Sequence, residues 1–233
     1  MIYELFQLLG DVPGARLMNY ISFRAIVAGV MGLCISIWVG RWFIELLKRK
    51  NISETQRDEK IDPFNVAKKG VPTMGGVVII AAMLIPCLLM GNLSNVYMIL
   101  MLITTVILGA LGFADDYIKT FRGNKDGLNG WIKIAGQITL GLIVGLTLRY
   151  SPEATMHERV TSHIENNITV FEKTPEVKST RTTIPFVKEH NFNYADMFSF
   201  LGENNKYKAG WIFFVILTIL VVAAVSNGAN LND

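Results

Sequence analysis

Residues 70–114 read GVPTMGGVVIIAAMLIPCLLMGNLSNVYMILMLITTVILGALGFA and contain no charged side chain. A membrane-spanning helix needs about 20 predominantly apolar residues, so this run of 45 residues is long enough for two spans. The polar sequence GNLSN at 91–95 supplies the turn between them. We therefore predict an integral membrane protein with neighbouring spans at about 74–90 and 96–114.

The rest of the 233-residue chain supports this prediction. Hydrophobic residues make up 51% of the sequence and charged residues 18%, whereas soluble domains carry about 25% charge. Further apolar stretches predict spans at about 20–47, 131–148 and 210–226. The expected fold is an all-α membrane protein with five transmembrane helices. A net charge of only +3 does not indicate a partner such as nucleic acid.

Lysine and arginine are distributed unevenly between the loops. The segment 48–73 carries seven of them and 115–130 carries three, whereas residues 1–19 carry only Arg16 and the turn at 91–95 carries none. Because short cytoplasmic loops are enriched in basic residues, we expect the two basic loops inside and the N-terminus outside.

This orientation divides the chain into three expected parts. Residues 1–148 hold spans one to four, and residues 210–233 hold the fifth span and its cytoplasmic end. Residues 149–209 form a polar extracytoplasmic insertion, which is β-prone at 168–171 and 182–187. Gly141 and Gly145 in the fourth span have the spacing of a close helix contact.

Polar residues gather at two helix ends that this topology places at the cytoplasmic surface. Asp115 and Asp116 directly follow the uncharged run, where full burial in the bilayer would cost roughly 2–3 kcal/mol. Asn227, Asn230 and Asp233 are spaced to share one helix face. Such oxygens suit Mg²⁺ and the hydrogen-bonding groups of a nucleotide. The alternative is that both groups are ordinary wet helix ends, which contribute little to stability.

Lysines lie beside these acidic residues in the sequence. Lys68 and Lys69 precede a glycine-rich stretch, and Lys133 opens the fourth span. Their number indicates a site for anionic ligands. Each of them also has a simpler interpretation, as a determinant of topology.

Several motifs give the chain a family resemblance. They are Pro72-Thr73-Met74-Gly75-Gly76, Asp115-Asp116-Tyr117, Gly127-Leu128 and Asn227-x-x-Asn230-Leu231-x-Asp233. In order and spacing the chain resembles the phospho-N-acetylmuramoyl-pentapeptide-transferases, a branch of the polyprenyl-phosphate N-acetylhexosamine-1-phosphate transferases. Lys133 and Gln137 also stand where that family has a lysine and a glutamine. The resemblance covers about residues 20–233.

The resemblance implies a function. Members of the family have ten spans and transfer phospho-MurNAc-pentapeptide from UDP-MurNAc-pentapeptide to undecaprenyl phosphate in the bacterial inner membrane, giving lipid I and UMP. It implies Mg²⁺ as cofactor and a possible homodimer. The implied site residues are Asp115 and Asp116 for catalysis, Asn227, Asn230, Lys133, Lys69 and Thr73 for nucleotide or substrate, and Asp233 and Asp116 for metal.

The chain departs from the family pattern at three places. Asn232 replaces a usual threonine, and Asp126 stands where a lysine is usual, which puts a phosphate contact from that loop in doubt. The sequence stops at Asp233, inside a motif. We therefore expect an N-terminal piece of such an enzyme, or a truncated reading frame, without activity on its own.

Two other functions stay open at this point. A transferase that uses UDP-GlcNAc is the alternative within the class. A non-catalytic or transporter-like membrane segment is the alternative outside it, although acidic residues at helix ends do not favour transport, since coupling sites lie at mid-span.

Overall fold

The structure is a computed structural model that describes residues 15–49, 74–122, 127–159, 163–165, 168–170, 173–183 and 191–231. Its α-helices are α2 (Ile21–Arg49), α3 (Gly76–Met90), α4 (Val96–Phe121), α5 (Gly130–Tyr150) and α6 (Glu203–Leu231). Two 3₁₀-helices, η1 (Ala15–Asn19) and η3 (Tyr194–Leu201), precede α2 and α6. The expected all-α membrane fold is confirmed.

Within the described residues, four helices are long and apolar enough to cross a membrane. They are α2, α4, α5 and the part of α6 from Asn205 to Ala229. The helix α3 is apolar but only 15 residues long, about 22 Å at 1.5 Å per residue, against about 30 Å of hydrocarbon. A helix therefore lies at each of the five predicted positions, and four of these helices have the length and composition of a membrane span. The predicted count of five spans is not confirmed.

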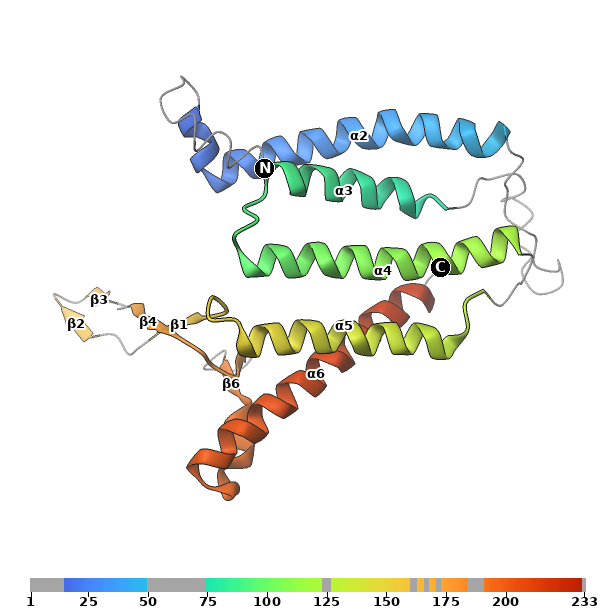
Figure 1. Ribbon diagram of the computed structural model, residues 1–233. Coiled ribbons are helices and arrows are strands. Elements are labelled where there is room, and N and C mark those ends of the chain that lie inside the picture. Colours follow the sequence, from blue (N-terminus) through green and yellow to red (C-terminus); the bar gives the residue numbers. More distant parts are fainter. Residues whose placement is uncertain are drawn as a thin grey trace. The chain divides into compact units, whose positions relative to one another are not determined.

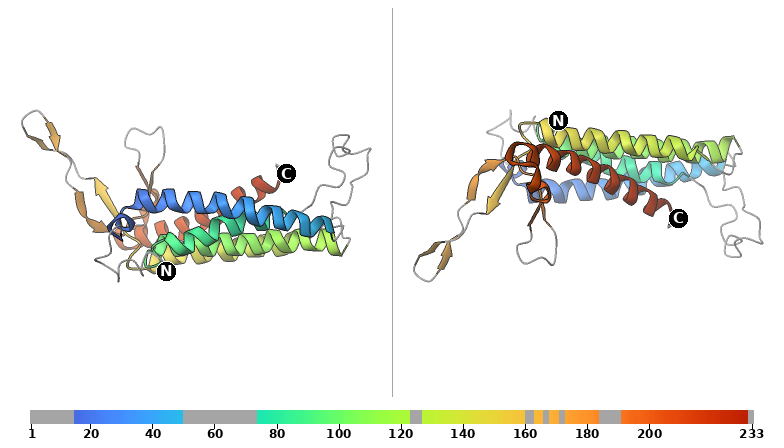
Figure 2. Two further views of the ribbon diagram at one scale, coloured as in Figure 1. Left: turned by 90° about the horizontal axis from the view of Figure 1, so that it is seen from above. Right: turned by 90° about the horizontal axis from the view of Figure 1, so that it is seen from below.

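The chain divides into two compact units, residues 1–136 and 137–233, with the division inside α5. In the first unit α3 packs against both α2 and α4, as all views show (Figure 1, Figure 2). The turn between α3 and α4 lies where the sequence predicts it. Asn95 caps α4, because its side-chain oxygen accepts hydrogen bonds from the backbone N–H groups of Tyr97 at 2.9 Å and Met98 at 3.3 Å.

The helix α4 continues beyond its predicted end. The sequence places the end of the span at Ala114, but the helix runs through both aspartates to Phe121. The first charge marks where an apolar span meets the interface and does not by itself stop a helix. Lys119 lies one turn after Asp115 and pairs with it, and this spacing stabilises the extra turns.

In the second unit, the later part of α5 packs closely against α6. A side chain at Gly141 would place its Cβ 2.7 Å from the Cα of Ile219, and one at Gly145 would lie 3.2 Å from Val215. The predicted close helix contact at these glycines is confirmed. The start of α6 is covered by η3, where the Tyr194 ring lies 5.5 Å from that of Phe213.

The segment before η3 contains β structure, as predicted. Three antiparallel pairs form there: β1 (Met156–Arg159) with β4 (Lys173–Val177), β2 (His163–Glu165) with β3 (Ile168–Val170), and β5 (Arg181–Thr183) with β6 (Asn191–Asn193). The helix α6 also begins earlier than the predicted 210, at Glu203.

Candidate functional site

Asp115 is a buried acidic residue in α4, with 6% of its surface exposed. From Val96 to Asp115 the helix rises about 30 Å, which is the thickness of the hydrocarbon core. The helix is therefore long enough to hold this carboxylate at the boundary of a membrane that it crosses. Asp115 is therefore not exposed as in the alternative of an ordinary wet helix end, because protein groups surround it.

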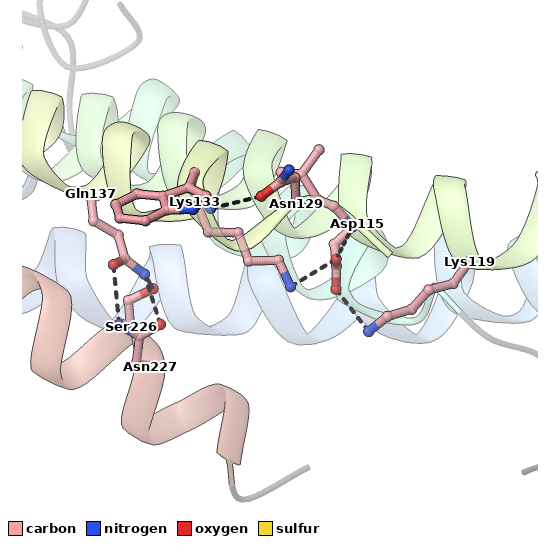
Figure 3. A network of polar contacts seen from close by, with 9 residues as sticks. Asp115, Lys119, Asn129, Lys133, Gln137, Ser226 and Asn227 are labelled. Atoms are coloured by element: carbon pink, nitrogen blue, oxygen red, sulfur yellow. Dashed lines mark hydrogen bonds and ion pairs between the residues drawn. The ribbon is translucent and has the colours of Figure 1, made fainter. Parts of the chain in front are cut away.

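Three N–H donors converge on the Asp115 carboxylate (Figure 3). Lys119 Nζ lies 2.8 Å from Oδ2, and Lys133 Nζ lies 2.9 Å from Oδ1. The backbone N–H of Leu128 donates to Oδ1 at 2.7 Å. Both carboxylate oxygens thus accept charge-assisted hydrogen bonds, which are the stronger kind in proteins.

Different local features place these donors. Lys119 is one helical turn from Asp115 in α4. Lys133 lies in the first turn of α5, which Asn129 caps by accepting from the Trp131 N–H at 3.0 Å. The sequence identifies Lys133 by resemblance but misses Lys119, although the i, i+4 spacing after an interfacial aspartate is a usable signal.

The charges in this group favour an anion. Two lysines meet one carboxylate, so the group carries a net positive charge, and the lysine side chains remain 36% and 25% exposed. An ammonium has three donors, so each lysine retains capacity beyond its bond to Asp115. The arrangement suits binding of a phosphate at the membrane surface.

Asp116 is the next residue of α4 and is half-buried. Successive residues of a helix point about 100° apart, so the two carboxylates do not face each other as a proton-sharing pair. The helical conformation of both residues therefore directs the two carboxylates to different sides of α4.

A second polar group lies in the second unit, between α5 and α6. Gln137, which is 4% exposed, donates from Nε2 to Ser226 Oγ and to Asn227 Oδ1, both at 3.1 Å. Asn227 Nδ2 donates back to Gln137 Oε1 at 3.2 Å (Figure 3). Gln137 thus holds the Asn227 amide in one orientation. Sequence reasoning missed the contribution of Ser226, whose hydroxyl no motif marks.

The remaining predicted site residues are less completely described. Asn230 lies in α6, three residues after Asn227. Lys69, Thr73 and Asp233 lie outside the described residues.

The described residues do not by themselves make a magnesium site. Both oxygens of Asp115 face lysine cations, which leaves it unsuited as a metal ligand. Among the described residues no three His, Cys, Asp or Glu side chains gather. Asp116 and Asp233 are the residues that would hold a metal.

A cavity of about 480 Å³ in the first unit lies away from this site. It is lined by the starts of α2 and α4 and the end of α3, including Arg24, Pro86, Met90, Tyr97 and Met101. From Met101 to Asp115 the helix rises about 20 Å. The cavity is therefore separate from the Asp115 group.

Comparison with known proteins gives consistent matches over the whole chain. The phospho-N-acetylmuramoyl-pentapeptide-transferase of Bacteroides fragilis is 60% identical, that of Phocaeicola vulgatus 59%, and that of Porphyromonas gingivalis 47%. Each match covers 100% of this chain and 56% of the relative. No family model matches the chain.

The apolar helices and the bacterial relatives identify a bacterial membrane protein. The chain spans about half the length of the curated relatives it matches. The matches cover the chain from end to end and agree with the resemblance of its motifs. By sequence, the chain is similar over its whole length to the phospho-N-acetylmuramoyl-pentapeptide-transferases of these bacteria.

Proposed function

We propose that the protein acts in the transfer of phospho-MurNAc-pentapeptide from its UDP carrier to undecaprenyl phosphate, giving lipid I and UMP. The observation that carries this proposal is the Asp115 carboxylate held by Lys119 and Lys133 at the end of the membrane helix α4. The name of the relatives supports the same reaction.

The chemistry needs a cationic group at a membrane boundary. An oxygen of the lipid phosphate attacks the sugar-bearing phosphorus of the donor. The bond from that phosphorus to the oxygen bridging the two phosphates breaks, and UMP leaves with the bridging oxygen. Both substrates are anionic and repel each other, so positive charge must offset this repulsion. One substrate has a long hydrocarbon tail and the other is water-soluble, so only an interfacial site meets both.

The two aspartates take different parts in this proposal. Asp115 places the lysines, because both of its oxygens are engaged by them and by the Leu128 N–H. The lysines then bind phosphate. Asp116 assists deprotonation of the lipid phosphate, and with Asp233 it would hold Mg²⁺, which supplies further charge neutralisation when bound.

The remaining assignments concern the donor substrate. Asn227 and Asn230 bind the nucleotide, and the Gln137 amide supports this by fixing the orientation of Asn227. Lys69 and Thr73 contribute further contacts to the donor phosphates. We place the site on the cytoplasmic side, from the positive charge of segments 48–73 and 115–130.

The experiment uses an extended protein, in which the chain is joined to the part of the Bacteroides fragilis relative that it does not cover. Membranes that contain this protein are given undecaprenyl phosphate, Mg²⁺ and either labelled UDP-MurNAc-pentapeptide or labelled UDP-GlcNAc. Lipid-extractable label and UMP should appear with the muramoyl donor. Transfer only from UDP-GlcNAc would favour the other branch of the superfamily. No transfer from either donor, with the intact relative active in parallel, would contradict the proposal.

A further inference from the structure

Gly127 has a backbone conformation that residues with a side chain rarely adopt, and it lies close to Asp115. Its φ is +70°, in the left-handed region where a Cβ meets the backbone. A Cβ at this position would also lie 2.3 Å from Oδ1 and 3.0 Å from Cγ of Asp115, and 2.7 Å from Cε of Lys119. The lack of a side chain therefore lets the backbone close directly over the carboxylate.

This close approach delivers the third donor to Asp115. The N–H that follows Gly127 in the chain, that of Leu128, reaches Oδ1 at 2.7 Å. A backbone donor has no rotamer freedom, so it fixes the oxygen more rigidly than a lysine does. The carboxylate is thereby held between a rigid amide and two flexible ammonium groups.

We propose that the Gly127–Leu128 turn is a positioning element, which fixes the Asp115 carboxylate and through it holds Lys119 and Lys133 in their ion pairs. The assignment of these lysines to phosphate rests on the proposed function. The ordering of the ion pairs by the turn does not rest on the proposed function, and it can be measured without substrate.

The test compares lysine reactivity in the chain itself, in detergent micelles, with limiting acetic anhydride and peptide mass spectrometry. Gly127→Ala should raise the acetylation rates of Lys119 and Lys133 by about 5-fold, the factor for losing a partly exposed ion pair. Lys206 is the internal reference, because it pairs with Glu203 at 2.8 Å in the other unit. Asp115→Asn sets the upper limit of the effect.

Matched variants separate the causes. Gly112→Ala and Gly130→Ala add the same methyl group nearby, where nothing lies within 4 Å, and should leave both rates unchanged. Asparagine tolerates a positive φ but still adds a Cβ. Gly127→Asn should therefore raise the acetylation rates of both lysines through the steric contact alone.

A rise confined to Lys119 and Lys133 in both Gly127 variants supports the proposal. Unchanged rates, or a rise shared equally by Lys206, would overturn it. The transfer assay above can fail while this result stands, so the two proposals are tested separately.

Discussion

At the residue scale, Lys119 and Lys133 share one carboxylate and are proposed to bind phosphate. Lys119→Gln or Lys133→Gln, made in the extended protein, removes one charge-assisted bond worth about 1.5–3 kcal/mol. The expected result is a fall in kcat/KM of roughly 10- to 100-fold for either change. Initial rates of UMP release measure it.

The control is Lys206→Gln, which removes another paired lysine whose partner Glu203 is 83% exposed. This change should leave kcat/KM within about 2-fold, since surface pairs contribute little. Equal losses in all three variants would mean that the Asp115 group has no special part in binding the substrates.

The sequence shows which residues are candidates at this scale but not how they contact each other. The uncharged run before Asp115 predicts a carboxylate at the membrane boundary. Its burial could not be predicted, because it depends on the approach of Gly127, twelve residues later, and of Lys133 from another helix. Asp115 and Asp116 look equivalent in the sequence, and only the structure distinguishes the one that holds the lysines.

At the scale of elements, apolar length placed the helices correctly but set their ends less well. The prediction for α4 stopped at the first charge, whereas the helix bonding continues to Phe121. The prediction for α6 began at 210 because the residues before Gly210 are polar, but the helix begins at Glu203. Lys206 pairs with Glu203 in this first turn. Hydrophobicity indicates which part of a helix contacts lipid. The backbone hydrogen bonding of the helix continues beyond the end of the apolar stretch.

The packing of α5 on α6 gives a prediction for stability. Gly141→Ala would place a methyl group 2.7 Å from the Ile219 backbone, and such overpacking costs about 1–3 kcal/mol. The thermal midpoint of the chain in detergent should fall by roughly 2–4 °C for each kcal/mol. The matched change Gly112→Ala meets nothing within 4 Å and should not lower it. An unchanged midpoint for Gly141→Ala would contradict the close contact.

At the scale of the whole molecule, the orientation rests on the positive charge of the predicted cytoplasmic loops. With Cys34 and Cys87 replaced by alanine, single cysteines are introduced as Lys60→Cys and Pro175→Cys. A membrane-impermeant thiol reagent applied to intact cells should label position 175 and not position 60. Labelling of position 60 from outside would show that the topology is opposite to the prediction and that the site does not lie at the cytoplasmic surface.

The turnover of Asp115→Asn and Asp116→Asn in the extended protein, measured together with thermal midpoints, decides whether the two aspartates act in phosphoryl transfer. Each change keeps the side-chain size and removes the charge, and each should lower the rate by about 100-fold or more. Only Asp115→Asn should also lower the midpoint, because it weakens a buried pairing worth about 1–3 kcal/mol. Near-normal turnover in both variants would contradict a role for this acidic pair in phosphoryl transfer.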